Sequence, residues 1–180
     1  MPPADGTLKA RLAALGIEIR ALEAHGLRRH REATSLRVAE VGADGREHRL
    51  APAAAQAWRA MRASAQRDGV AIFIVSAFRG IERQVEIVRR KLESGQSLEQ
   101  ILTVSAPPGY SEHHTGRAVD VGTVGVTPLE VEFERSAAFG WLRERAAEFG
   151  YRLSYPRGNA DGYQYEPWHW CHHAARQARR

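Results

Sequence analysis

Two separated clusters of polar residues have the side chains needed to bind a metal ion and hydrolyse a substrate with it. The first runs from Ser111 to Asp120 (SEHHTGRAVD) and the second from Glu166 to His169 (EPWH). A catalytic zinc ion takes three imidazole or carboxylate ligands, keeps its fourth position for water and needs a base close to that water. The two clusters supply groups of all these kinds and therefore predict metal-assisted hydrolysis.

One candidate ligand set combines His113, Asp120 and His169, each of which lies near Gly, Pro or Trp residues that restrict the backbone or exclude water. Adjacent residues in extended backbone point in different directions, so His113 and His114 are not expected to bind the same ion. One of the two is a ligand and the other a neighbour. A hydrogen-bonded structural role is the interpretation for three further histidines, His25, His30 and His48.

The hydrophobic pattern predicts the elements that position these clusters. The run Val70–Val75 is too apolar for a half-exposed strand, so we expect a central strand that is buried on both faces. Arg79 lies on the loop that follows this strand, and a rigid strand can support a loop that presents a functional side chain. Asp120 lies on a short predicted strand, and Gly116 would let the backbone pass close to the ion. Further predictions are a helix over 8–26, a hairpin at 36–46, helices over 52–66, 81–92 and 139–149, and strands over 118–121 and 151–155.

These elements predict the α+β class, with a small central antiparallel sheet flanked by helices. At 180 residues the chain has the size of one domain, and we expect a single catalytic domain over residues 1–180. Cys171 is the only cysteine, which excludes an internal disulfide and a thiolate zinc cluster.

Charge and hydropathy narrow the range of partners. The 26 Lys and Arg residues exceed the 21 Asp and Glu residues by five, which is a mild basic excess. A basic run at 28–31 has no base-stacking motif beside it, so we interpret it as a solvated helix end and expect no nucleic-acid partner. No run approaches the roughly 20 apolar residues of a membrane span, and the N-terminus shows no secretion signal.

The spacing Ser111-x-His113-x-x-Gly116-x-Ala118-x-Asp120, followed by Glu166-Pro167-Trp168-His169, resembles the two signatures of VanY-like D-alanyl-D-alanine carboxypeptidases. These enzymes belong to the lysostaphin, D-Ala-D-Ala and hedgehog-type group of zinc metallopeptidase folds. The resemblance covers roughly residues 70–169 and implies a hedgehog/DD-peptidase-like metallopeptidase core over residues 70–173. Residues 1–50, the N-terminal helix and hairpin, carry no such match.

The resemblance implies a role for each matching position. His113, Asp120 and His169 would bind one Zn²⁺ ion, Glu166 would act as general base, and Arg79 would stabilise the oxyanion. Ser111, Gln84 and Trp168 would contact the substrate, although Gln84 could be a plain helix residue and Ser111 a plain turn residue.

The chain departs from the family pattern after the last ligand. Trp170-Cys171-His172-His173 stands where the family usually has an arginine and an aromatic residue. His114 or His172 could therefore orient a ligand or the substrate. We do not expect Cys171 to be a nucleophile, because no histidine can be argued to activate it.

The implied activity is hydrolysis of peptidoglycan stem peptides by removal of the C-terminal D-alanine. An endopeptidase or a dipeptidase with the same catalytic residues is the alternative within this fold. An alternative of another class is a zinc-bearing peptide-binding domain without turnover, which Glu166 and Arg79 argue against. The substrate places the protein in the cell envelope or periplasm, with the cytoplasm left open because the chain shows no signal. The oligomeric state is open, with a monomer as the default.

Overall fold

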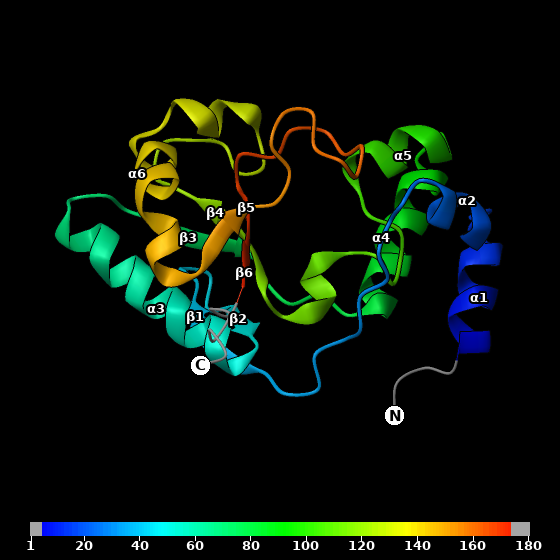
Figure 1. The fold of residues 1–180 in the computed structure, drawn as a ribbon, viewed down its shortest axis with the longest axis horizontal. Helices are drawn as coiled ribbons and strands as arrows, with labels where there is room; N and C mark the ends of the chain where they lie inside the picture. Colours follow the sequence, from blue (N-terminus) through cyan, green and yellow to red (C-terminus); the bar gives the residue numbers. More distant parts are fainter. Residues whose placement is uncertain (1–4, 174–180) are drawn as a thin grey trace, which may run out of the picture.

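A four-stranded antiparallel sheet brings the two polar clusters together in the computed structural model, which describes residues 5–173 (Figure 1). The strands run in the spatial order β3 (Phe73–Ser76), β4 (Ala118–Gly122), β6 (His169–His172) and β5 (Tyr151–Leu153). Asp120 of β4 pairs with His169 of β6 and, on its other side, with Ser76 of β3. The sheet register thus sets the two clusters side by side and brings the loop that carries Arg79 next to them.

The expectation of a central strand at Val70–Val75 is wrong, because β3 lies at the edge of this sheet and β4 and β6 are central. The run is apolar because Ile72 and Ile74 pack into the core. The Glu40 carboxylate accepts a hydrogen bond from the backbone N–H of Ile74, with 3.1 Å between N and Oε1. A buried side chain therefore satisfies a donor on the edge strand that a further strand would otherwise have paired.

The remaining elements lie around this sheet. The hairpin of β1 (Arg37–Val41) and β2 (Glu47–Leu50) forms as expected. The helices are α1 (Asp5–Ala14), α2 (Ile19–Ala24), α3 (Pro52–Arg67), α4 (Ile81–Glu93), α5 (Leu98–Val104) and α6 (Ala137–Arg145), and 3-10 turns cover Glu112–Thr115, Val131–Arg135 and Ala146–Phe149. The predicted α+β class, with a small antiparallel sheet and flanking helices, is confirmed. None of the described helices is both long and apolar enough to span a membrane.

Two local predictions are corrected, and two further elements were not predicted. The single helix expected over 8–26 is two helices, because Gly16 takes a left-handed conformation with φ of 74° between them. The helix expected over 139–149 ends at Arg145 and continues as a 3-10 turn. Helix α5 and strand β6 were not expected, since their apolar residues are too few to show a period.

Two apolar cores support the two sides of the molecule. One core joins the sheet to α3 and α6, and Trp58, Met61 and Leu142 are among its fully buried residues. The other joins α1 and α2 to α4 and α5, through residues such as Leu12 and Val88. Figure 1 shows these two groups of helices on opposite sides, with the loops of the polar clusters between them.

Candidate active site

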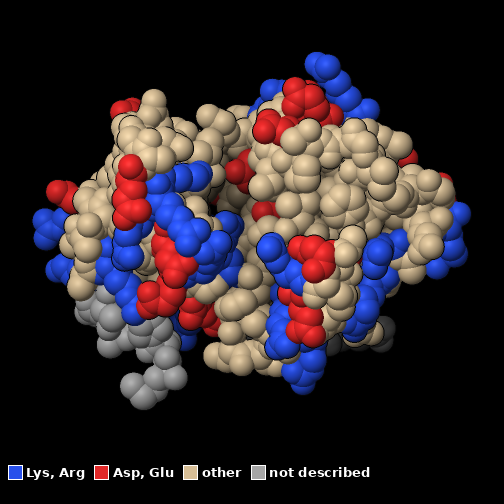
Figure 2. Space-filling model, turned by 180° about the vertical axis from the view of Figure 1, so that it is seen from behind, with Lys and Arg blue, Asp and Glu red and all other residues tan. Residues whose placement is uncertain are grey.

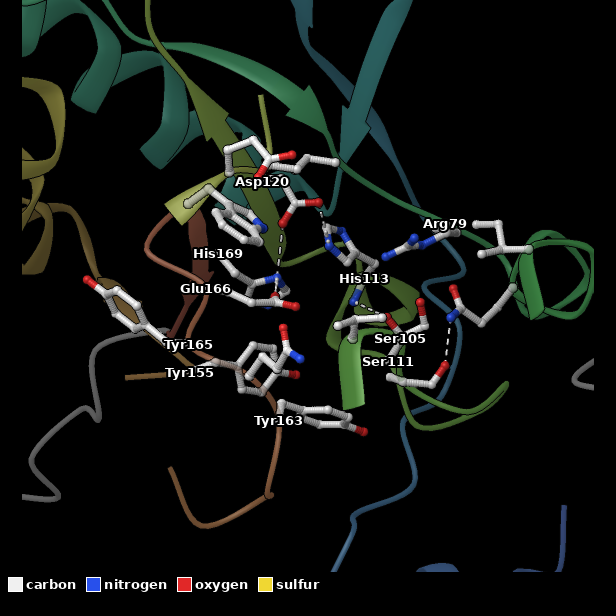
Figure 3. Close-up of a pocket in the computed structure, with 18 of the residues that line it drawn as sticks. Arg79, Ser105, Ser111, His113, Asp120, Tyr155, Tyr163, Tyr165, Glu166 and His169 are labelled. Carbon is white, nitrogen blue, oxygen red and sulfur yellow. Dashed lines mark hydrogen bonds and ion pairs between the residues drawn. The ribbon is translucent and has the colours of Figure 1, made fainter. Parts of the chain in front are cut away.

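Three buried side chains on neighbouring elements form a possible metal site. His113 lies on a 3-10 turn, Asp120 on β4 and His169 on β6, and ligand atoms of all three lie within 4.8 Å of one another. The Asp120 carboxylate is 3.2 Å from Nε2 of His113 and 3.0 Å from Nδ1 of His169. Ligand atoms around a tetrahedral zinc ion lie about 3.3 Å apart, so the spacing and the donor types fit this metal. Figure 3 shows the three side chains pointing toward one another.

In each imidazole, one ring nitrogen contacts a partner outside the triad. The other nitrogen faces Asp120 and is the one that could bind a metal. His113 Nδ1 lies 2.7 Å from the carbonyl oxygen of Ala77, so its Nε2 faces the site. His169 Nε2 lies 3.0 Å from Oε2 of Glu112, so its Nδ1 faces the site. Ser154 Oγ donates to the same Glu112 oxygen at 2.5 Å. This contact of Glu112 with His169 was not expected from the sequence, although Glu112 stands next to His113 in the first cluster.

Electrostatics favours the ionised form of each carboxylate close to the imidazoles. Burial opposes ionisation of Glu112, but hydrogen bonds from His169 and Ser154 lower its pKa to about 2. Burial also opposes ionisation of Asp120, yet His113 and His169 hold its pKa well below its usual range. Burial lowers the pKa of His113, which favours its neutral imidazole. Burial acts in the same direction on His169, but hydrogen bonds to Asp120 and Glu112 raise its pKa to about 10, so a metal that binds there displaces a proton.

Glu166 lines the same pocket as the three candidate ligands and is partly buried. Its Oε2 lies 3.7 Å from Nδ1 of His169, beside the possible metal site. Burial raises the pKa of Glu166 to about 7, against the opposing effects of His169 and Arg79. A carboxylate with a pKa near neutrality can both accept and return a proton under ordinary conditions. The possible metal site is formed by His113, Asp120 and His169 without Glu166.

Arg79 reaches the same site from the loop that follows β3. Its Nε is buried and has no hydrogen-bond partner among the described residues. Arg79 lines the same pocket as Asp120 and Glu166. Burial lowers the pKa of Arg79, and these two carboxylates act in the opposite direction. Its backbone is fixed by His114, whose Nδ1 lies 2.6 Å from the Arg79 carbonyl oxygen and whose Nε2 accepts from the N–H of Gly109. His114 therefore holds the backbone at Arg79 and does not face the triad. This agrees with the expectation that only one of His113 and His114 is a ligand.

One pocket of about 450 Å³ collects all the predicted site residues. Its lining includes Arg79, Gln84, Ser111, His113, Asp120, Glu166, Trp168 and His169. A pocket of this size suits a small or peptide-sized ligand. From behind, a hollow lies between the two halves of the molecule, and both basic and acidic side chains lie along its edges (Figure 2).

Three buried polar atoms in this pocket have no hydrogen-bond partner among the described residues: Arg79 Nε, Gln84 Oε1 and Tyr163 OH. Buried polar groups are normally paired, so a cluster of unpaired ones indicates that a ligand supplies the missing partners. Tyr155, Tyr163 and Tyr165 also line the pocket and lie on one side of it in Figure 3. The sequence reasoning missed these tyrosines, because they stand in and beside a loop that shows no period.

Three further expectations from the sequence concern Gly116, His172 and Cys171. Gly116 does not face the site, because a side chain there would meet the backbone N of Ala51 at 2.9 Å; it serves the packing of the 3-10 turn. His172 packs its ring on Tyr151, with 5.3 Å between ring centroids, and does not line the pocket. Cys171 is buried, and burial raises the pKa of its thiol well above the usual range, which disfavours a reactive thiolate.

Comparison with known proteins agrees with this geometry. Residues 47–175 match the VanY family, D-alanyl-D-alanine carboxypeptidase. A D-alanyl-D-alanine carboxypeptidase of Enterococcus faecium is 33% identical over 118 residues, which are 64% of this chain and 34% of that protein. The chain therefore spans about a third of the length of this relative.

Solved structures with the same fold include LdcB, an LD-carboxypeptidase, with 28% identity and a TM-score of 0.70 over 78% of this chain and 69% of that chain. A variant of the vancomycin-resistance D,D-pentapeptidase VanY in complex with Zn(II) has 28% identity and a TM-score of 0.60, over 77% of this chain and 78% of that chain. VanYB in complex with D-alanine-D-alanine gives the same identity and TM-score, over 77% of this chain and 76% of that chain. Since the family match covers most of the chain and includes both polar clusters, the chain belongs to the VanY family of D-alanyl-D-alanine carboxypeptidases.

Proposed function

We propose that this protein is a zinc-dependent carboxypeptidase that removes the C-terminal D-alanine from peptidoglycan stem peptides. The observation that carries the proposal is the buried triad of His113, Asp120 and His169, which shares one pocket with Glu166 and Arg79. The related VanY structures, in complex with Zn(II) and with D-alanine-D-alanine, support the choice of metal and of substrate class.

In the proposed reaction the side chains of this chain divide the work. The triad would hold one Zn²⁺ ion, which supplies Lewis acidity and makes a water molecule easier to deprotonate. Glu166 Oε2 accepts the proton from the attacking water and then passes it to the leaving amine. The Arg79 guanidinium, whose Nε is unpaired, donates hydrogen bonds to the oxyanion that develops on the substrate carbonyl.

A peptide substrate also explains the polar atoms farther from the triad. Gln84 Nε2 donates to the carbonyl oxygen of Ala106 at 2.6 Å, which leaves its Oε1 as an acceptor for a substrate N–H. Ser111 is buried, and its Oγ accepts weakly from the backbone N–H of His113 at 3.3 Å, so it can also bond to substrate. Trp168 is half-buried at the pocket wall and offers apolar contact area.

A second candidate is removal of a terminal D-alanine from an L,D bond, which the similarity to the LD-carboxypeptidase LdcB favours. Both reactions use the same catalytic groups and differ in the residue that precedes the cleaved bond. The endopeptidase and dipeptidase alternatives also share these groups. A binding domain without turnover would need only the metal ligands, so the presence of Glu166 and Arg79 in the same pocket argues against it.

The same substrate logic extends to location and assembly. Stem peptides of peptidoglycan lie outside the inner membrane, so we expect the protein to act in the cell envelope. We expect a monomer to be active, because one chain supplies every side chain of the proposed site.

The test is to incubate the zinc-loaded protein with muramyl pentapeptide and tetrapeptide, with and without a chelator, and to identify the products by mass. Release of alanine from the pentapeptide supports the proposal, and release from the tetrapeptide alone supports the L,D reaction. Internal fragments indicate an endopeptidase. The Glu166→Gln variant should retain zinc but lose about 10²–10⁴-fold in turnover. The Glu130→Gln variant is the matched control, since Glu130 is an exposed carboxylate on the rim of the same pocket. A wild-type protein that yields no chelator-sensitive product would overturn the proposal.

A further inference from the structure

Helix α4 presents two different faces, and one of them forms a wall of the pocket. Ile81, Val85 and Val88 pack into the core shared with α1 and α2. Gln84, Ile87 and Lys91, at steps of three and four residues, line the pocket instead. Side chains at this spacing lie on the same side of a helix, and the backbones of Gln84 and Lys91 are about 10 Å apart. A packed helix therefore holds Lys91 toward the site.

The Lys91 ammonium is held in place but is not neutralised. Its Nζ donates to Ser105 Oγ at 2.6 Å, and no carboxylate forms an ion pair with it in the part of the chain that the structure describes. An ammonium group has three donors, so two remain for a ligand. By contrast, Arg83 on the same helix pairs with Glu86 at 2.8 Å and is exposed.

Lys91 lines the same pocket as Arg79 and Glu166. Burial lowers the pKa of Lys91, nearby Arg79 lowers it further, and Glu166 raises it. Two cations that disfavour each other in a partly buried pocket gain from an anion placed between or beside them. Figure 3 shows Ser105, the partner of Lys91, on the same side of the pocket as Arg79 and Ser111.

A peptide end has the complementary chemistry. It carries N–H groups, which suit the unpaired acceptor Oε1 of Gln84, and one carboxylate, which suits a cation with free donors. The carboxylate follows the last peptide bond within a single residue, about 3.8 Å of chain. An internal peptide segment has no such charge and would leave Lys91 without a counter-ion.

We propose that Lys91, positioned by Ser105, binds the free α-carboxylate of the C-terminal residue of the substrate and so makes the site prefer chain ends to internal bonds. This inference rests on the proposed peptidase function and names a specificity-determining residue for it. Lys91 contacts the substrate terminus in this role and takes no part in proton transfer.

The experiment compares two stem-type peptides that are identical except that one ends in a carboxylate and the other in a carboxamide. The wild-type kcat/KM should favour the carboxylate peptide by about 10- to 100-fold, the range expected for a hydrogen bond between charged groups. In Lys91→Met the ratio of the two kcat/KM values should fall to about one. Lys91→Arg, which keeps the charge, should retain part of the ratio. Lys9→Met is the matched control, since Lys9 is exposed on α1 and does not line this pocket.

Binding measurements give a readout that does not depend on turnover. Both peptides are titrated by calorimetry into the zinc-loaded Glu166→Gln variant, with and without Lys91→Met. Selective binding of the carboxylate peptide that disappears with Lys91→Met supports the inference, whether or not the wild type turns the peptides over. Equal binding of the two peptides, or an equal loss for both on Lys91→Met, would overturn it. The absence of any cleavage by the wild type would instead overturn the proposed function.

Discussion

The chemistry of the site depends on how a few buried polar side chains hold one another. Asp120 lies between His113 and His169, and each imidazole is oriented by a second partner, the Ala77 carbonyl or Glu112. Such partners fix the ring so that the correct nitrogen faces the metal. The folded protein therefore holds the candidate metal ligands in fixed orientations. We make two predictions about this site.

The first prediction concerns pH. Glu166 must be deprotonated to accept a proton, so kcat/KM should rise with pH up to the pKa of Glu166 and fall about tenfold per unit below it. Burial raises this pKa to about 7, and a bound cation would lower it, so the acidic limb should lie at or below pH 7. The measurement is the pH profile of kcat/KM for the zinc-loaded protein. A profile that stays flat from about pH 4 to 8 would contradict the role of Glu166.

The second prediction concerns Glu112. Replacing it in Glu112→Gln removes the charge that orients His169 through Nε2 while leaving a group of the same shape. Zinc affinity should fall by about 10- to 100-fold, the usual cost of losing such a partner. Competition with a fluorescent chelator measures the affinity, and Glu132→Gln, an exposed change on a 3-10 turn, is the control. Equal zinc affinities for the two variants would show that Glu112 does not support the metal.

Strand pairing decides which residues meet. Asp120 and His169 are 49 residues apart in the chain but directly opposite each other in the ladder of β4 and β6. The edge strand β3 then delivers the loop with Arg79, and the buried Glu40 holds that strand. Its carboxylate accepts from the Ile74 N–H at 3.1 Å and from the Trp58 indole N–H at 2.9 Å.

Removal of this carboxylate should destabilise the fold. Glu40→Ala leaves two buried donors, on Ile74 and Trp58, without a partner, and each unpaired donor costs about 1–3 kcal/mol. The free energy of unfolding, measured by urea titration, should therefore fall by about 2–6 kcal/mol. Glu47→Ala, an exposed change on β2, should lower it by less than about 1 kcal/mol. Similar values for the two variants would contradict the role of Glu40 at the strand edge.

The pocket lies between two parts of the protein that have separate apolar cores. The metal ligands and Glu166 belong to the sheet side, whereas Gln84 and Lys91 belong to α4, which packs on α1 and α2. The N-terminal helices, which lie outside the family match, thus support the wall of the pocket that carries these two side chains.

A substitution in the core that supports α4 should weaken peptide binding without changing metal binding. Leu12 of α1 is fully buried in the apolar core that α1, α2, α4 and α5 share, so Leu12→Ala should lower the free energy of unfolding by about 2–5 kcal/mol. The peptide KM should rise because the wall with Gln84 and Lys91 loses support, while zinc affinity should stay unchanged. Val41→Ala is the control, since Val41 is 57% exposed on β1. A loss of zinc affinity without a change in KM would contradict this division.

The sequence allowed much of the site to be predicted, because the groups that bind metal and move protons have distinctive chemistry and spacing. All eight predicted residues line one pocket, and the alternation of β4 puts Asp120 in the site and Val119 in the core. Helices α3 and α4 lie close to their predicted bounds, because each carries a long, regular apolar stripe.

What local pattern could not supply is the set of contacts between distant segments. An apolar run predicts a buried strand, but it does not show whether a neighbouring strand or a side chain such as Glu40 accepts hydrogen bonds from the backbone N–H groups of that strand. For this reason the sequence predicts a central strand where β3 is an edge strand. Nothing in the chain order links Glu112 to His169 or Lys91 to Ser105, which meet through strand register and the packing of α4. The residue types and their order determined the chemistry available to this protein. The folded structure decided which of these groups share a pocket, because packing and strand pairing depend on the free energy of the whole chain rather than on any one segment.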